Sequence, residues 1–270
     1  MAQGFRNQVK AQDAIEFIHK TEIPIGRKIT YTNFVCNYRP LKFEPYRVRI
    51  TVGGDKLDYP YTTASPAASI IEAKLIVNSV ISDHKKHKSR FCAIDLNNFF
   101  LATPMERAEY IRIHKKHITK NFMQEYKLQN KITKDEYLYC KVKKGMYGFK
   151  QAAAILAYKL LVKRLEQDDY IPIPLTNGLF KHRTCRTTFA LCVDNFGVKY
   201  NSEEDLIHLI QMLKKNYDIL IDRTGKNYCG LTFEWHYKEG FVDVSMPMYV
   251  QKALKKFLHP TPQRPQYAPH

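Results

Sequence analysis

Two aspartates stand where an enzyme could use them to bind metal ions. Asp95 ends the short apolar run "RFCAIDL", which is typical of a buried strand. Asp194 lies between two alternating apolar runs in "TTFALCVDNFGVKY". Two carboxylates brought together from such positions supply hard oxygen ligands and, in a basic chain, suit magnesium-dependent phosphoryl transfer. Taken singly, each has a simpler explanation, Asp194 as a turn former and Asp95 as a helix cap or surface acid.

The charge of the chain favours a polyanionic partner. Its 270 residues include 43 Lys and Arg against 26 Asp and Glu, which leaves a formal net charge of +17. Basic clusters lie at 84–90, 112–120 and 141–145, where contacts with phosphates would make affinity strongly dependent on salt. Each cluster is also explained as a solvated basic face.

Composition narrows the class of protein. The length allows one large domain or a few packed subdomains, and no apolar run reaches the roughly 18 residues of a membrane span. The first twenty residues lack the apolar middle of a secretory signal, so we expect an intracellular protein, cytoplasmic or nuclear, with no membrane partner. The six cysteines form no Cys-x-x-Cys pair, and the pairs His84/His87 and His114/His117 have no third ligand nearby in sequence. Neither a zinc site nor a disulfide framework is therefore expected.

Periodic segments predict the elements that must position the two acids. The stretch 47–52 alternates arginines with apolar residues, as in a strand that ends at Gly53–Gly54. A helix is expected to open at Ser65–Pro66 and to stop near Ser82, and a second to run from 152 to 166. The apolar stripe of the first helix consists of Ile70, Ala73, Val77 and Val80.

The segment around Asp194 predicts a hairpin. Alternating residues on both sides leave Asp194–Asn195 as a two-residue connection, and both residue types tolerate a tight turn. Ser202 with Asp205 predicts the start of the next helix, and 231–245 predicts a second hairpin. The sequence-distant acids are therefore expected at strand ends.

Five ordered blocks between Arg47 and His259 resemble the reverse transcriptase domain of copia-type retrotransposons. "TASPAASIIEAK" and "FCAIDLNNFFLATPM" resemble the family's Ser-Pro-Val helix and first aspartate block, which puts Asp95 at a metal-binding position. "YCKVKKGMYGFKQAAA" resembles the Tyr-Gly-Leu-Lys-Gln-Ala block. "FALCVDNFGV" is similar to the Tyr-Val-Asp-Asp hairpin, and "YCGLTFEWHYKEGFVDVSMPMYVQKAL" to the strand and helix that follow it.

The resemblance implies an α+β fold of the right-hand polymerase type, with an antiparallel palm sheet backed by helices. Fingers are expected at 1–90, and a palm at 91–245 with an inserted fingers segment at about 111–150. The start of a thumb and a Pro-rich tail are expected at 246–270. The hand would then be incomplete, without the family's ribonuclease H region.

The resemblance also implies RNA-directed DNA polymerisation. Asp95 and Asp194 would anchor two magnesium ions, for which manganese can substitute, and Asn195 would occupy the second position of the hairpin's acidic pair. The partners would be an RNA or DNA template with its primer and a dNTP, and the chain could belong to a larger retrotransposon polyprotein.

Further residues match positions that contact the nucleotide in the family. Arg47 or Arg49 would bind the triphosphate tail, and Gln151 would touch the sugar or template base, or else cap its helix. Phe100 takes the place of an aromatic gate against a ribose 2'-hydroxyl, and it is equally explained as a core aromatic. Lys226 would protonate the leaving pyrophosphate, or is a solvated loop lysine.

Departures from the family leave two functions of different classes open. Asn195 replaces an aspartate and so removes a negative charge that would offset divalent ions. Cys192 replaces the hairpin tyrosine, and Ala153–Ala154 replace Pro-Arg. One hypothesis is an active reverse transcriptase, and the other is an inactive retrotransposon remnant that at most binds nucleic acid through its basic surface.

Overall fold

The computed structural model describes residues 13–38, 46–57, 66–149 and 156–258, which fold as two compact units. Unit 1 contains the described residues up to 57 together with those from 98 to 168, and unit 2 contains the rest. Residues 66–90, which the prediction groups with the N-terminal fingers, lie in unit 2, and the predicted domain boundaries stay a prediction. The identification of the units with fingers and palm stays a prediction.

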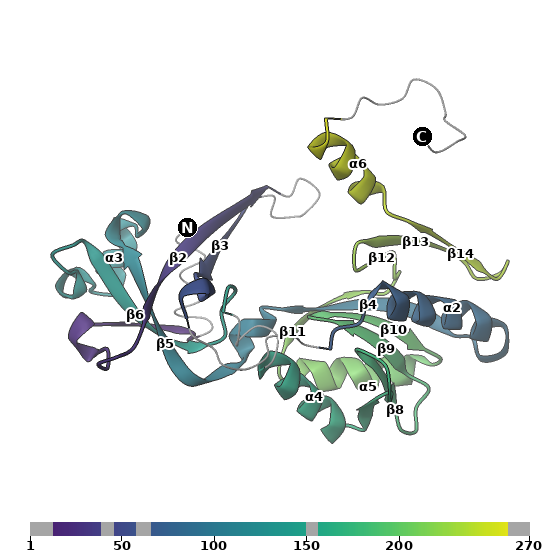
Figure 1. Cartoon of the computed structure of the whole chain (residues 1–270). Coiled ribbons are helices and arrows are strands. Elements are labelled where there is room, and N and C mark those ends of the chain that lie inside the picture. Colours follow the sequence, from purple (N-terminus) through teal and green to yellow (C-terminus); the bar gives the residue numbers. More distant parts are fainter. Residues whose placement is uncertain (1–12, 39–45, 58–65, 150–155, 259–270) are drawn as a thin grey trace. The chain divides into compact units, whose positions relative to one another are not determined.

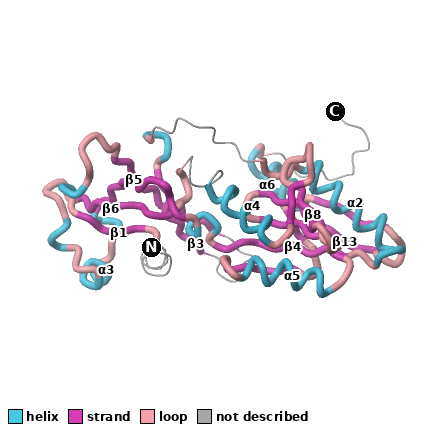
Figure 2. The backbone as a smooth tube through the Cα atoms, turned by 90° about the horizontal axis from the view of Figure 1, so that it is seen from below, coloured by secondary structure: helices cyan, strands magenta, loops and turns pink. Residues whose placement is uncertain are grey.

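Unit 1 is built on a five-stranded sheet in which one neighbouring pair is parallel and the others are antiparallel. The strand order is β1 (Ile15–Ile18), β6 (Tyr137–Lys144), β5 (Pro104–His114), β2 (Ile29–Tyr38) and β3 (Tyr46–Val52), and Figure 2 shows β1, β6 and β5 side by side. Its helices are η2 (Lys20–Glu22), η3 (Gly54–Lys56), η4 (Phe99–Ala102), η5 (Lys115–His117), α3 (Lys120–Glu125), η6 (Gln129–Lys131) and α4 (Ala157–Gln167). Strand β3 confirms the strand expected at 47–52.

The loop at Gly148 is joined to β3 by close backbone contact. The Val52 N–H donates to the Tyr147 carbonyl over 2.8 Å. Gly148 has a positive φ of 102°, and a Cβ atom there would lie 2.0 Å from the Val52 carbonyl oxygen. No side chain fits at that distance, so glycine is required at the centre of the block "MYGF".

Unit 2 is built on a six-stranded antiparallel sheet. The strand order is β11 (Asp218–Asp222), β4 (Arg90–Asn97), β10 (Asn195–Tyr200), β9 (Thr188–Cys192), β8 (Leu179–His182) and β7 (Tyr170–Pro172). Helices α2 (Ile70–His87) and α5 (Glu203–Lys214) lie on opposite faces of this sheet (Figure 1). Strands β12 (Asn227–Tyr228), β13 (Leu231–His236) and β14 (Phe241–Ser245) form a small sheet, which α6 (Pro247–Lys256) follows. The predicted α+β class, with an antiparallel sheet backed by helices, is confirmed at this level.

Strand alternation gives unit 2 a core on each face of its large sheet. On the α2 side, Phe91 and Ala190 form one cluster with Ile76 of α2 and Phe233 of β13. On the α5 side, Phe196 of β10 is fully buried. Among the described residues, no helix is both long and apolar enough to cross a membrane.

Helix α2 begins later than the predicted start at Ser65–Pro66. Its N-cap is Ser69, which forms a reciprocal capping box with Glu72. The capping box satisfies two amide groups at the helix start, whereas a lone serine cap satisfies one. The reciprocal hydrogen bonds therefore decide where the helix begins.

The end of α2 and the start of α4 also differ from their predicted positions. Helix α2 continues past Ser82 into the basic run and ends at His87, because Lys and His residues in the last turn interact favourably with the helix dipole. Ile70 is half exposed, and Ile76 is buried in the stripe instead. The predicted beginning of the later helix, 152–155, lies outside the described residues. Helix α5 does begin after Ser202, whose side chain accepts a hydrogen bond from the Asp205 N–H.

Candidate functional site

One end of the unit 2 sheet carries a row of four facing residues. The register places Asn195 opposite both Cys192 of β9 and Asp95 of β4, and Asp95 opposite Leu220 of β11. Residues directly opposite one another point to the same face, with Cβ atoms about 4.5–5.5 Å apart. Leu220 is 58% exposed, so this end of the face opens to solvent. The row gives Asp95, which is itself partly buried, a polar neighbour.

The second acid, Asp194, lies in the turn between β9 and β10. Because Cys192 and Asn195 are paired, the two-residue connection is Val193–Asp194. The prediction of Asp194–Asn195 was wrong by one residue, since Asn195 extends the ladder with Asp95. Val193 adopts a positive φ of 61°. This conformation is rare for a β-branched residue and costs about 1–3 kcal/mol.

A backbone hydrogen bond joins the turn to the strand that carries the first acid. The Asp194 carbonyl accepts from the Leu96 N–H over 2.9 Å. Leu96 directly follows Asp95, so Asp194, in the turn that leads into β10, is held beside the strand that carries Asp95, at the same end of the sheet. The structure thus brings together residues that are 99 positions apart in sequence.

The side chain of Asn195 is bonded to the second acid. Its Nδ2 donates to Asp194 Oδ1 over 2.8 Å. An ionised aspartate at position 195 has no hydrogen to donate and would repel the neighbouring carboxylate. Asn195 therefore orients the Asp194 carboxylate and occupies one of its acceptor positions.

Small residues next to this row allow strand β12 to lie against the sheet. The Tyr228 hydroxyl donates to the Ala190 carbonyl over 2.8 Å. A Cβ atom at Gly197 would lie 2.8 Å from the Tyr228 ring, which explains the glycine in "DNFGV". Gly197 pairs with both Ala190 and Ala93. These three residues form the next row on the same face of the sheet as Asp95, and the Tyr228 ring covers that row.

The turn after β12 brings a second cysteine to the hairpin. Burial, together with the neighbouring Cys192 thiol and the Asp194 carboxylate, raises the pKa of the Cys229 thiol to about 12. Cys229 as a residue is exposed, but its sulfur lies against Cys192. No sequence signal identifies this neighbour, because only the folding of β12 over the sheet brings it to the hairpin.

The donor atoms at this end of the sheet are chemically suited to a hard divalent cation, and the metal site itself stays a prediction. The carboxylates of Asp95 and Asp194 and the amide oxygen of Asn195 are ligands of the type that magnesium takes. Three protein oxygens leave much of an octahedral shell for water and substrate phosphates. The Cys229 thiol, with its raised pKa, is protonated at neutral pH and so is a poor competitor for the ion.

Lys226, the predicted proton donor, lies in the loop between β11 and β12. Its N–H donates to Asp222 Oδ2 over 3.1 Å, and its carbonyl accepts from the Phe233 N–H over 2.8 Å. Asp222 pairs with Ala93, two residues before Asp95. The loop backbone is therefore fixed to the same sheet, while the exposed Lys226 side chain extends into solvent. Its role in proton transfer stays a prediction.

Three of the predicted nucleotide-binding residues, Arg47, Arg49 and Phe100, belong to unit 1. The Arg49 guanidinium lies 4.9 Å from the centre of the Tyr147 ring, and its buried Nε has no hydrogen-bond partner among the described residues. Phe100 is 7% exposed and packs edge-on against Tyr147, and its role as an aromatic gate stays a prediction. Arg47 lies in β3 opposite Asn37, and Gln151 lies outside the described residues.

Comparison with known proteins gives only distant structural similarity. No protein-family model and no curated protein match the chain. Apo telomerase from Candida tropicalis is 11% identical, with a TM-score of 0.47 over 91% of this chain and 53% of that chain. Telomerase from Candida albicans in complex with a fragment of telomeric RNA is also 11% identical, with a TM-score of 0.45 over 95% of this chain and 52% of that chain. The chain thus spans about half the length of these telomerase chains.

Proposed function

We propose that the chain is the RNA-directed DNA polymerase domain of a copia-type retrotransposon. The observation that carries the proposal is the β4–β10 register, which sets Asn195 opposite Asp95 and leaves Asp194 in the adjoining turn. Two acids at one open sheet end, in a chain of net charge +17, suit transfer of a nucleotide between polyanions. The template, primer and dNTP are the partners that this activity requires.

Asp95 and Asp194 would hold two magnesium ions. When bound, the ions supply charge that lowers the pKa of a primer 3'-hydroxyl and neutralises a triphosphate. Asn195 keeps the Asp194 carboxylate oriented through its 2.8 Å hydrogen bond. Asn195 also leaves the site one negative charge weaker than a pair of aspartates, so we expect weak metal binding.

Arg49 supports a role for unit 1 in binding the triphosphate. A buried guanidinium N–H without a partner is costly, and its cost falls when an anion accepts from it. The Tyr147 ring holds the guanidinium in place before a ligand arrives. Lys226 is the candidate that would give a proton to the leaving pyrophosphate.

A second candidate function is nucleic-acid binding without catalysis. Asn195 is the observation that favours it, since the charge deficit next to Asp194 could lower metal occupancy below what turnover requires. The chain would then be a remnant whose basic surface still binds polyanions.

Primer extension separates the two functions. The full chain is given a poly-A template, an oligo-dT primer and dTTP, with magnesium or manganese. We expect incorporation that falls by at least about 10³-fold in Asp95→Ala and in Asp194→Ala, because each change removes a metal ligand.

Glu239→Ala is the matched control. Glu239 is an exposed acid in the β13–β14 turn of the same unit, so its loss should leave incorporation unchanged. Duplex binding by the wild-type chain without incorporation under either metal would reject the polymerase and favour the remnant.

A further inference from the structure

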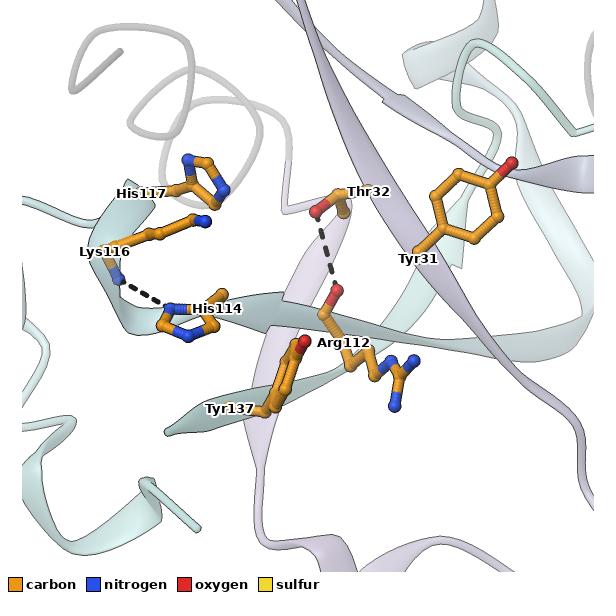
Figure 3. A pocket seen from close by; sticks show the side chains of 7 residues that line it. All are labelled: Tyr31, Thr32, Arg112, His114, Lys116, His117 and Tyr137. Carbon is orange, nitrogen blue, oxygen red and sulfur yellow. Dashed lines mark hydrogen bonds between the residues drawn. The ribbon is translucent and has the colours of Figure 1, made fainter. Parts of the chain in front are cut away.

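A pocket of about 180 Å³ opens in unit 1, where strands β2, β5 and β6 meet the short helix η5 (Figure 3). This volume is roughly 12 to 18 times the 10–15 Å³ that one water molecule needs. It is smaller than the roughly 300–1,000 Å³ of pockets for drug-sized ligands. The pocket therefore suits a compact group and not a whole cofactor.

The lining of the pocket is cationic. Arg112 and Lys116 contribute full positive charges, and His114 and His117 add imidazole rings. Figure 3 shows Lys116 extended towards the middle of the pocket beneath His117. In the described part of the chain, neither Arg112 nor Lys116 has an acidic group within ion-pair distance. No acid is among the lining residues, so an anion is the ligand that these charges favour.

The acids that border the pocket are already engaged. Glu136 forms an ion pair with Lys115, which holds the pKa of the Glu136 carboxyl below its usual range, and it lies 3.8 Å from His114 Nε2. Asp55 accepts a hydrogen bond from the Tyr31 hydroxyl over 2.9 Å. Neither acid neutralises the two lining cations.

Aromatic contacts hold Arg112 and the two histidines in place. The Arg112 guanidinium lies 4.9 Å from the centre of the Tyr137 ring, and the His114 ring meets Tyr137 edge-on at 5.1 Å. His117 stacks on Phe34 with 4.7 Å between ring centres. Because these side chains are ordered before a ligand arrives, binding costs less conformational entropy.

The pKa of His117 responds to its surroundings in the pocket. Burial, and then the charges of Lys116 and His114, lower the pKa of His117 below its ordinary value. A bound anion would offset these charges and raise the pKa of His117 again. The sign of that change can be measured.

We propose that this pocket binds a phosphate group, carried either by a nucleic-acid strand or by a mononucleotide. Phosphate presents several acceptor oxygens in a compact shape, which matches the Arg112 guanidinium, the Lys116 ammonium and the His117 imidazole around one small cavity. The residues come from unit 1 alone, so the site does not depend on the proposed catalysis at Asp95.

Fluorescence anisotropy tests the pocket on the full chain without metal ions or dNTP. A labelled single-stranded 12-mer DNA is titrated against the wild type and the double variant Arg112→Gln/Lys116→Gln over a range of salt. We expect the variant to bind at least fivefold more weakly, with a log–log salt slope smaller by about 1.4, which is two contacts at roughly 0.7 each.

The double variant Lys120→Gln/Lys134→Gln is the matched control. Both lysines are exposed in unit 1 and lie outside the pocket lining. Equal weakening in both double variants would overturn the proposal, because the cations would then act only as general surface charge. Competition with AMP and with inorganic phosphate identifies the source: displacement by micromolar AMP indicates a mononucleotide site, and resistance to AMP indicates a strand.

Histidine NMR covers the case in which the pocket variant misfolds. Inorganic phosphate added to the wild type should shift the His114 and His117 signals and raise the pKa of His117, while the signals of His84 and His182 in unit 2 stay unchanged. Signals of His114 and His117 that do not move at saturating phosphate would also overturn the proposal. Asp95→Ala should bind the 12-mer as the wild type does, so failure of this site and failure of catalysis are distinguishable.

Discussion

At the scale of single residues, the candidate site depends on one amide. Asn195 donates to Asp194 Oδ1 and lies opposite Asp95, so it contacts one acid and neighbours the other. It stabilises the hairpin without metal, since it replaces repulsion between carboxylates by a hydrogen bond. The same substitution lowers the negative charge that would attract magnesium.

Asn195→Asp should lower the stability of the protein without metal and strengthen its binding of magnesium. Without metal, we expect the variant to lose about 1 kcal/mol of unfolding free energy, because the hydrogen bond is replaced by like charge. With 10 mM magnesium, its Tm should rise by several degrees more than that of the wild type. Differential scanning calorimetry with and without magnesium measures both effects.

Asn195→Ala is the control for this change, since it removes the hydrogen bond but adds no charge. It should lose stability without gaining a response to magnesium. If Asn195→Asp responds to the ion no more than Asn195→Ala does, the pair at Asp95 and Asp194 is not a metal site.

At the scale of elements, close backbone contacts fix the position of a loop, whereas the sequence of that loop shows only that a glycine is present. Gly148 has left-handed backbone and no space for a Cβ atom next to Val52. Gly26, also in unit 1, has a similar φ of 82° but nothing within 4 Å of its Cβ position. Substitution of Gly26 therefore measures the free-energy cost of the left-handed backbone alone, whereas substitution of Gly148 adds the cost of steric overlap.

Gly148→Ala should destabilise unit 1 far more than Gly26→Ala does. Gly26→Ala has only the left-handed backbone to oppose it, which costs about 1–2 kcal/mol. Gly148→Ala adds overlap with the Val52 backbone at 2.0 Å, so we expect a total loss of at least about 3 kcal/mol. Urea unfolding of the two variants compares them, and equal losses would show that the loop is not held against β3.

At the scale of the whole molecule, charge determines the class of partner and not the place of binding. The net charge of +17 is spread along the chain, and only some of the cations line a defined pocket. The basic run 112–120 supplies Arg112, Lys116 and two histidines to that pocket, whereas 84–90 begins in the last turn of α2. Similar sequence clusters thus have different structural roles.

Binding of single-stranded nucleic acid by the full chain should weaken steeply with salt. If several phosphates are contacted, affinity should fall at least about tenfold between 50 and 200 mM salt. Asp95→Ala should have the same slope, because loss of an acid removes no phosphate contact. A titration of a 20-mer by anisotropy gives the slope, and a flat response would argue against a polyanion as the partner.

Sequence by itself determined the local features, because these depend on neighbouring residues. Strand β3, the β9–β10 and β13–β14 hairpins and the Ser202 cap follow from periodicity of two and from capping chemistry. The predicted start of α2 was wrong because the sequence offers two serines, Ser65 and Ser69, as N-caps. Only Ser69 forms a capping box with Glu72. The turn was predicted one residue away from Val193–Asp194, because the alternation of apolar and polar residues does not determine which residue is the last to pair between the two strands.

Only the tertiary structure decided which distant residues meet. The opposition of Asp95 and Asn195 depends on strand register, and the approach of Cys229 depends on Tyr228 lying over Gly197. The pocket in unit 1 likewise requires the parallel pairing of β2 with β5. Such contacts arise from pairing between segments far apart in the chain, for which a short stretch of sequence carries no periodic signal.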